Sequence, residues 1–404
     1  MSRSIRILKK VATGLSSSPH LANVIFSSEL STKRGRLDVD VQSPVVSSTI
    51  NFGVHLVVKG DSLQLIAKSR NSEGKRLLRN VLVSRARLRS TPVEHLVLEE
   101  DLHGGGADAI LRLLVGWVQE IRSLLLTWEQ VVNGDLVTPE DSVLGFWWDG
   151  KANFGDAAGP WLINKMTGKN VINARNSRAI GVATPNIGSL FQMINYPRVD
   201  FWGCGLLYPP NERQVERLRS LEQARIFAVR GEKTRETLQQ MVGWEVPAVY
   251  GDPALLFPRY LQIEQRGHAA GVALIPHRQH SKYFDTRDIG NVELLSVADD
   301  VREVVTSIAT SEVCVSTSLH GVIFAQAYGV PWVWLNVQDD ELKGGEFKFE
   351  DFFTTIDRDA VSRVDVSTHD LLALDVEDVA TRAALPETLI DLDMLERSFP
   401  ISGD

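Results

Sequence analysis

Cysteine is scarce in this sequence: the 404 residues contain two, Cys204 and Cys314. The two lie far apart, each inside an apolar run, which predicts buried and reduced thiols. This pattern argues against a disulfide framework and a cysteine-rich zinc site, and it is typical of a cytosolic protein. We therefore expect no bound metal.

Long apolar runs are absent as well. No stretch of 18 apolar residues occurs, so no transmembrane helix is predicted. The basic residues within 3–10 are followed by 11–16, which is not the apolar core of a secretory signal. The sequence also lacks a G-x-G-x-x-G phosphate loop, a repeat of solenoid period and a nucleic-acid-binding motif. We expect a soluble, cytoplasmic protein with no nucleic-acid partner.

The net charge of −8 is unevenly distributed. Residues 1–100 hold 16 lysines and arginines against 8 aspartates and glutamates, whereas the remainder holds 27 against 43. The basic part could face an anionic partner, such as the inner face of a membrane, or it could be a solvated basic face beside an acidic domain. We predict a mobile basic arm at 1–40, with its densest cluster at 33–36.

The hydrophobic pattern changes along the chain. Alternating apolar residues at 49–58 and 63–67, separated by a turn at 59–62, predict a β-hairpin. Apolar residues spaced i, i+3, i+4 and i+7 predict an amphipathic helix at 110–128. We therefore predict a β-rich N-terminal module at 41–140, linked by this helix to the rest of the chain.

From Ser142 onward, short apolar strands alternate with helical segments. This order is the signature of a mostly parallel α/β sheet. We predict a first Rossmann-like domain at 141–256, a linker from 257, and a second Rossmann-like domain at 270–404 with a C-terminal helical segment.

One strand–turn–helix–strand unit stands out because it brings a histidine to a helix N-terminus. Residues 313–315 read as a buried strand, the hydroxyl residues at 316–318 occupy the place of an N-cap, and Gly329 supplies the stop. A helix N-terminus favours anions, so His320 in its first turn could contact a phosphate or carboxylate and still transfer a proton. The alternative is a structural turn with a capping histidine.

Seven short motifs occur in a defined order between about 142 and 355. They are Asn153-Phe154-Gly155-Asp156, Phe201-Trp202-Gly203-Cys204-Gly205, Val229-Arg230-Gly231, Tyr250-Gly251-Asp252-Pro253-Ala254-Leu255, Ile275-Pro276-His277, Ser316-Thr317-Ser318-Leu319-His320-Gly321 with Ala325 to Pro331, and Gly344 to Phe352. Together they resemble the polysaccharide pyruvyl transferase family, and more closely its exopolysaccharide ketal pyruvyltransferase-like branch. Many members carry arginine where Ser318 stands, so one candidate donor-binding cation is missing.

The resemblance implies a fold and an activity. The fold would be α/β and GT-B-like, with two Rossmann-like domains facing a cleft, preceded by the β-rich module. The activity would be transfer of the pyruvyl group of phosphoenolpyruvate onto two hydroxyls of a sugar, in a precursor of a cell-surface polysaccharide or glycolipid. Phosphoenolpyruvate would be the donor substrate, with no cofactor, and the acceptor a sugar or lipid-linked oligosaccharide. The alternatives are a GT-B nucleotide-sugar glycosyltransferase and a non-catalytic glycan-binding protein.

The matched motifs supply candidate site residues. We expect His320, Arg230 and Asp156 to act in catalysis, and His277, Trp148 and Trp202 to bind the acceptor. The expected donor-binding residues are Asn153, Phe154, Gly155, Arg230, Ser316, Ser318, His320 and Lys348.

Each of these roles has a plainer alternative. Arg230 follows a strand at its carboxyl end, where open α/β sheets bind ligands, and its planar fork suits an anion, but it could equally form a cap or a surface ion pair. Lys348 could be a solvated charge on an edge strand. Asp156 could cap the next helix, and Trp148 and Trp202 could simply be core residues.

Overall fold

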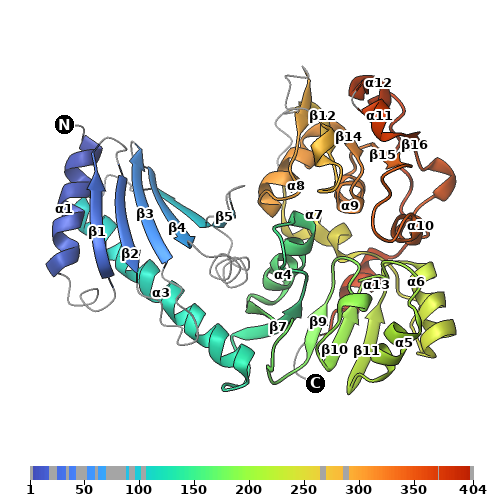
Figure 1. The fold of residues 1–404 in the computed structure, drawn as a ribbon, viewed down its shortest axis with the longest axis horizontal. Coiled ribbons are helices and arrows are strands. Elements are labelled where there is room, and N and C mark those ends of the chain that lie inside the picture. Colours follow the sequence, from blue (N-terminus) through green and yellow to red (C-terminus); the bar gives the residue numbers. More distant parts are fainter. Residues whose placement is uncertain are drawn as a thin grey trace. The chain divides into compact units, whose positions relative to one another are not determined.

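The computed structural model describes residues 3–17, 25–32, 36–41, 52–59, 62–69, 88–90, 96–101, 106–263, 270–284, 291–371 and 373–400. The chain divides into two compact units (Figure 1). Unit 1 comprises Met1–Val137 with Arg178–Ile180, and unit 2 comprises Thr138–Ser177 with Gly181–Asp404.

Unit 1 is an antiparallel sheet with two helices. The six strands follow the order β1-β2-β3-β4-β6-β5. Their bounds are β1 Ile25–Ser31, β2 Arg36–Val41, β3 Phe52–Lys59, β4 Ser62–Ser69, β5 Leu88–Ser90 and β6 Leu96–Asp101, and the helices are α1 Arg3–Ser17 and α3 Ala107–Asn133. Strands β3 and β4 pair from Phe52↔Ser69 to Lys59↔Ser62, which confirms the predicted hairpin.

The helix predicted at 110–128 is confirmed and is longer at both ends. Its apolar stripe, which includes Ile110, Leu114 and Val118, packs in one core with residues of β2 and β3. The helix ends at Gly134, whose φ of 81° is the left-handed conformation that favours glycine at a helix end. A further strand predicted near 81–83 lies outside the described residues.

The N-terminal segment differs from the mobile arm predicted at 1–40. Residues Arg3–Ser17 form α1, because Leu8, Val11 and Leu15 recur on one face and are buried against the sheet and α3. The exposed side chains of α1 include Arg6, Lys9 and Lys10. Part of the N-terminal basic charge is therefore the solvated face of an amphipathic helix. Residues 33–35 of the predicted basic cluster lie outside the described residues.

Unit 2 contains two parallel five-stranded sheets, which confirms the predicted α/β class. In its amino half (138–177 and 181–263) the strand order is β11-β10-β9-β7-β8. The elements are β7 Ser142–Phe146, α4 Phe154–Thr167, β8 Asn170–Asn173, β9 Ala183–Pro185, β10 Arg198–Trp202, α5 Glu212–Arg219, β11 Gln223–Ala228, α6 Glu232–Thr237 and α7 Phe257–Tyr260.

The carboxyl half of unit 2 (270–284, 291–371 and 373–400) has the strand order β13-β12-β14-β15-β16. Its elements are β12 Ala270–Ile275, β13 Val292–Leu294, α8 Val301–Ala309, β14 Ser311–Ser316, α9 Leu319–Ala327, β15 Trp332–Val337, α10 Phe347–Phe353, β16 Arg363–Val366, α11 Thr368–Leu371, α12 Val376–Ala380 and α13 Leu392–Arg397. Every strand pair recorded in the two sheets of unit 2 is parallel.

Within the first Rossmann-like domain, short apolar runs predict strands at 179–182 and 248–250, and the structure differs at both. The strand expected at 179–182 lies at Ala183–Pro185, after Gly181, which has a φ of 146°. The strand expected at 248–250 is reduced to a single bridge between Val229 and Tyr250, since Gly251, at a φ of 132°, turns the chain away.

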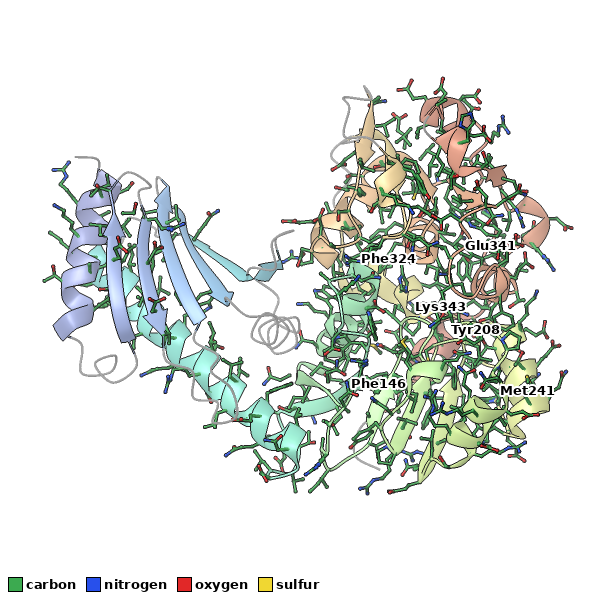
Figure 2. All side chains as sticks on the ribbon, in the orientation of Figure 1. Phe146, Tyr208, Met241, Phe324, Glu341 and Lys343 are labelled. Carbon is green, nitrogen blue, oxygen red and sulfur yellow. The ribbon has the colours of Figure 1, made fainter. Side chains whose placement is uncertain are left out.

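One hydrophobic core joins the two halves of unit 2. Phe257, in the segment predicted as a linker, is fully buried and stacks on Trp161 at 4.7 Å, with Phe324 edge-on at 4.8 Å. Figure 2 labels Phe146 of β7 and Phe324 of α9, which are buried in the amino and carboxyl halves respectively. Within the described part of the chain, no helix combines the length and apolar character needed to span a membrane.

Candidate functional site

The first element of the site is the N-terminus of α4. Asn153 has an extended backbone, and its side chain accepts a hydrogen bond from the Gly155 N–H at 3.0 Å, so Asn153 caps the helix. The sequence pattern predicts a loop at 150–156, whereas in the structure a helix begins at Phe154, and Asp156 lies in its first turn and not at its cap. The Asn153 side-chain oxygen, expected to bind the donor, is engaged in this cap.

Gly155 lies directly against His320 of α9. A Cβ atom at Gly155 would lie 1.9 Å from His320 Nδ1, so only glycine permits this approach. Phe154 is fully buried and packs edge-on to the same imidazole, with ring centroids 6.3 Å apart. Phe154 supports His320 from the core, and the donor contact expected of it does not fit this position.

The imidazole of His320 keeps one nitrogen free. Its Nε2 is buried and has no hydrogen-bond partner among the described residues. Burial, with Lys348, Arg230 and His277 nearby, lowers the pKa of His320 to about 3. The side chain is therefore a neutral imidazole in the free protein, with an unpartnered ring nitrogen as expected of a group that awaits a ligand.

Asp156 and His320 approach the same backbone segment. A Cβ atom at Gly188 would lie 3.8 Å from Asp156 Oδ1 and 4.0 Å from His320 Nε2. Burial raises the pKa of Asp156 to about 7, an effect that Asp149 adds to and that Arg278 and Lys348 oppose. The carboxyl group can thus exist in either protonation state near neutral pH.

Lys348 adds a nearly buried cation to the cluster formed by His320 and Asp156. Its side chain lies on α10, not on the edge strand of the alternative interpretation, and is 9% exposed. Burial, followed by the charge of Arg230, lowers the pKa of Lys348 to about 8, and Asp156 opposes this shift. Within 106–263, 270–284 and 291–371 the ammonium forms no ion pair, so its charge is available to a ligand.

Arg230, expected to bind the donor, is engaged by other residues of the protein. It is fully buried, and its guanidinium donates to Asp351 at 2.9 Å, to Ser189 at 2.8 Å and to the Leu206 carbonyl at 2.7 Å. Helix α10 lies against α6, which follows β11, so Arg230 reaches Asp351 of α10 and each of its guanidinium nitrogens already has a partner in the protein. Because Asp351 follows Lys348 by three residues, this ion pair fixes the helix that carries the free cation.

The two serines before α9 differ from each other. Ser316 is fully buried, and its hydroxyl donates to the Ile275 carbonyl of β12 at 2.8 Å and accepts from the Ser318 N–H at 2.9 Å. Its expected donor contact does not fit this structural position. The Ser318 hydroxyl makes no hydrogen bond to the residues that the structure describes, which leaves it free to bind a ligand.

The expected acceptor residues are only partly brought together. His277 is half-buried near the cluster, and burial, Lys348, His280 and Arg278 together lower its pKa to about 3. Trp148 is half-buried, with the Arg175 guanidinium over its ring at 4.5 Å. Trp202 is fully buried and donates to the Leu395 carbonyl at 2.9 Å, so it is a core residue, and the acceptor contact expected of it does not fit this position.

Sequence reasoning missed Arg278 and Gly188. Arg278 follows His277 on the loop after β12, and its guanidinium donates to the Ala152 carbonyl while its charge acts on Asp156. Its position beyond the carboxyl end of a parallel strand was a usable signal. Gly188 has a φ of 109° and belongs to none of the seven motifs, so no signal pointed to it.

The arrangement favours anion binding combined with proton transfer. Lys348 and Arg278 supply positive charge, Asp156 supplies a carboxyl group that titrates near neutrality, and His320 supplies an unpartnered ring nitrogen. In the described residues, no group of three or more histidine, cysteine, aspartate or glutamate side chains is placed to hold a metal ion.

Two comparisons bear on this site. Residues 198–339 match the family model described as polysaccharide pyruvyl transferase. The matched range includes Arg230, His277 and His320 and ends before Lys348. The chain is also 26% identical over 181 residues to the uncharacterized protein L143 of Acanthamoeba polyphaga mimivirus, a match that covers 43% of this chain and 60% of that protein. The chain thus spans less than two thirds of this relative, whose name states no activity. Residues 198–339, less than half of the chain, are thus similar to the polysaccharide pyruvyl transferase family.

Proposed function

We propose that the protein transfers the pyruvyl group of phosphoenolpyruvate to two hydroxyl groups of a sugar, giving a cyclic ketal and phosphate. The acceptor would be a precursor of a cell-surface polysaccharide or glycolipid. The observation that carries the proposal is the nearly buried Lys348, which has no ion-pair partner in the described part of the chain and lies close to Asp156 and His320. The donor carries a carboxylate and a phosphate, and such charges require cations in a water-poor site.

The reaction needs one proton delivered and two removed. The methylene carbon of the donor gains a proton and becomes a methyl group, and two sugar hydroxyls attack the adjacent carbon as its bond to the phosphate oxygen breaks. Of the two hydroxyl protons, one replaces the proton given to the methylene and the other leaves with the phosphate. In this scheme Asp156, with a pKa of about 7, donates the first proton and is then able to accept one back.

His320 and Lys348 would act on the donor. Lys348 would pair with its phosphate or carboxylate, and His320 Nε2 would contact the leaving phosphate. Binding of a polyanion would raise the pKa of His320 from about 3 towards neutrality, since an opposite charge favours the protonated imidazole. None of these steps requires a metal or redox cofactor, and we propose that none is used.

A GT-B-like arrangement of unit 2 belongs to the same proposal. The two parallel sheets would be the two domains of this architecture, with the donor held where their residues meet. The composition of the cluster supports this idea, because Asp156 comes from the amino half and His320 and Lys348 come from the carboxyl half.

A thermal-shift and phosphate-release experiment tests the function. We expect phosphoenolpyruvate to raise the melting temperature of the wild type, since a ligand that binds the native state stabilises it. The stabilisation should disappear in Lys348→Met and persist in Lys343→Met, a matched change at an exposed lysine of the loop that precedes α10 (Figure 2). With a sugar acceptor, phosphate release should fall at least about 100-fold in Lys348→Met, as expected for loss of a buried charge contact, and should not change with EDTA.

The contrary results are equally specific. Stabilisation by UDP-, GDP- or CMP-sugars without any effect of phosphoenolpyruvate would favour the glycosyltransferase alternative. Equal behaviour of the two lysine variants would remove Lys348 from the donor site.

A further inference from the structure

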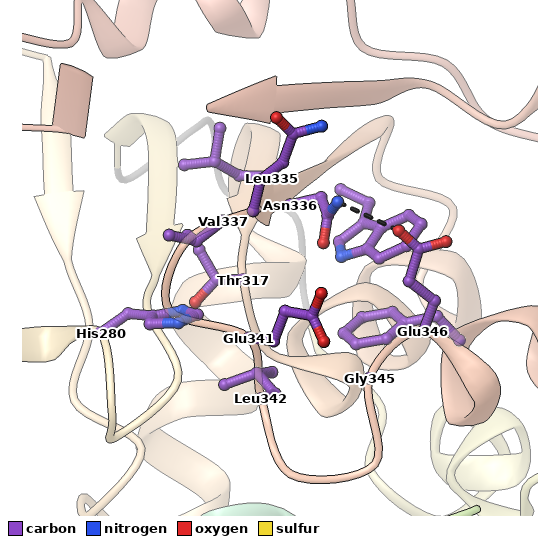
Figure 3. A pocket seen from close by; sticks show the side chains of 12 residues that line it. His280, Thr317, Leu335, Asn336, Val337, Glu341, Leu342, Gly345 and Glu346 are labelled. Carbon is purple, nitrogen blue, oxygen red and sulfur yellow. Dashed lines mark hydrogen bonds between the residues drawn. The ribbon is translucent and has the colours of Figure 1, made fainter. Parts of the chain in front are cut away.

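A separate cavity lies at the carboxyl ends of β14 and β15 in unit 2 (Figure 3). Its volume is about 160 Å³, room for about one sugar ring. The residues that line it include His280, Thr317, Trp334, Asn336, Glu341 and Phe349. None of these six takes part in the anion-binding cluster around His320 and Lys348.

The apolar wall of the cavity is rigid. Trp334 and Phe349 stack with ring centroids 4.5 Å apart and planes inclined by 16°. Arg363 lies over the Trp334 ring at 4.7 Å and also bonds Glu346, at 2.5 and 2.9 Å, on the polar side of the cavity. The wall is therefore fixed in advance, which lowers the entropy cost of binding.

One ring nitrogen of His280 receives no hydrogen bond from the described residues. The residue is 1% exposed, and its Nε2 lies 2.8 Å from the Asp340 carbonyl oxygen. A carbonyl only accepts, so Nε2 carries the proton and Nδ1 is an acceptor. Nδ1 is buried and has no partner among the described residues. A buried acceptor of this kind is costly unless a ligand or a water supplies a donor.

The remaining polar groups of the cavity are also mostly acceptors. The Glu341 carboxylate points into the space in front of the aromatic wall (Figure 3) and forms no hydrogen bond or ion pair with the described residues. The Asn336 side-chain NH2 donates to Glu346 at 3.2 Å and to Asp365 at 2.8 Å. Its side-chain oxygen can therefore accept a hydrogen bond from a ligand. Thr317 accepts from the His277 N–H at 2.7 Å and keeps its own proton to donate.

These groups select the chemistry of the ligand. The lining contains no lysine or arginine, and the neighbouring Arg363 is already paired with Glu346, so a phosphate or carboxylate would meet the carboxylate of Glu341 and no free cation of the lining. Unpartnered acceptors require donors, and several donors on a small neutral molecule are what the hydroxyl groups of a sugar provide.

The cavity adjoins the anion-binding cluster along the chain. Thr317 precedes His320 by three residues, and its hydroxyl holds the backbone of His277. On α10, Phe349 of the cavity wall follows Lys348 of the cluster. A sugar in the cavity would thus lie on the same two segments that hold the donor.

We propose that this cavity is the acceptor subsite, which binds one sugar ring through hydroxyl groups that donate to Glu341, His280 and Asn336. The inference rests on the proposed pyruvyl transfer and assigns its second substrate to a place of its own. The positively charged cluster would then take the donor, and the acidic cavity would take the neutral acceptor.

The test measures binding of methyl glycosides of galactose, glucose, mannose and N-acetylglucosamine by NMR saturation transfer. It uses the full chain as wild type, Glu341→Gln, Asn336→Ala and the control Glu312→Gln, an exposed position at the opposite end of β14. We expect at least one glycoside to bind the wild type and the control equally. Its Kd should rise about tenfold in Glu341→Gln and in Asn336→Ala.

Equal binding to all four proteins, or no binding of any glycoside, would overturn the subsite. So would a Mg²⁺-induced thermal shift of the wild type that Glu341→Gln abolishes, because the acceptors would then serve a cation. The melting temperature with phosphoenolpyruvate is measured on the same proteins. If the donor stabilises all four while the sugars ignore the cavity, the subsite fails and pyruvyl transfer stands; if the donor stabilises none, pyruvyl transfer itself fails.

Discussion

At the scale of single residues, the site depends on a carboxyl group whose protonation is linked to folding. The pKa of Asp156 is about 7 in the folded protein, above its ordinary value near 4. Between these values the folded state holds a proton that the unfolded state has lost. The stability that this carboxyl contributes is therefore complete at low pH and is lost as the pH rises through about 7.

We predict that Asp156→Asn is stabilising at pH 8 relative to the wild type, by about 1–3 kcal/mol after allowance for partial exposure. The advantage should shrink towards pH 4, because the wild-type carboxyl is then protonated in both states. Urea unfolding at pH 5 and pH 8 measures the change, and Asp135→Asn, at an exposed aspartate, is the control. A difference in the free energy of unfolding between Asp156→Asn and the wild type that does not vary with pH would contradict the raised pKa.

Gly155 is the residue on which the position of His320 depends. In Gly155→Ala the new methyl group would overlap His320 Nδ1, so the imidazole must move. We expect phosphate release to fall at least about 100-fold, as expected when a catalytic group is displaced by an ångström, and the melting temperature to fall as well.

Gly116→Ala is the matched control for this change. Gly116 lies exposed on α3 with no atom within 4 Å of its missing Cβ, so alanine there should stabilise the protein by about 0.5–1 kcal/mol. Full activity of Gly155→Ala would show that His320 does not act in the reaction.

At the scale of elements, α10 is held by one buried ion pair. Arg230 and Asp351 are both fully buried, 2.8 Å apart, and Asp351 also accepts from Thr234 N–H and hydroxyl, each at 2.7 Å. Removing one partner of such a pair costs about 3–5 kcal/mol, because the other charge is left uncompensated.

We predict that Arg230 affects the binding of the donor only through its ion pair with Asp351. Arg230→Met and Asp351→Leu should each weaken phosphoenolpyruvate binding, and the double variant should bind no more weakly than either single variant. In urea unfolding, the double variant should lose less free energy of unfolding than the two single variants lose in sum. Additive losses of donor affinity would mean that Arg230 contacts the donor itself, as the sequence alone suggested.

The elements also show what sequence could and could not predict. The unit around His320 follows from local rules: β14, the helix up to Ala327 and the stop at Gly329, with a φ of 69°, are where the pattern placed them. The helix α10 was missed, because Phe347-Lys348-Phe349 alternates like a strand whereas Phe349, Phe352 and Phe353 are buried with helical spacing.

The fate of Arg230 could not be read from its surroundings in the sequence. Its partner Asp351 lies 121 residues further along the chain, and only the packing of α10 on α6 brings the two together. The cavity beside β15 was missed for a similar reason, because His280, Asn336 and Glu341 come from separate loops. Residue types and local spacing identify candidates, but long-range packing decides which of them remain free.

At the scale of the whole molecule, the two cysteines provide a probe of how unit 2 unfolds. Cys204 lies in the amino half and Cys314 in the carboxyl half, and both are fully buried with thiol pKa values raised by burial. Reaction with a thiol reagent requires an exposed thiolate, so neither should react in the native protein.

Each thiol can therefore report the opening of its own half. We predict that dithiobisnitrobenzoate labels both thiols over the same range of urea concentration, since one core joins the halves. The variants Cys204→Ala and Cys314→Ala each leave one thiol to be labelled. After correction for any difference in their free energies of unfolding, the urea midpoints of labelling should be equal. Labelling of one site at a clearly lower urea concentration would mean that the halves unfold separately. The same burial means that a thiol-specific oxidant should leave Cys204 and Cys314 unmodified in the native protein, because oxidation of either thiol requires unit 2 to open first.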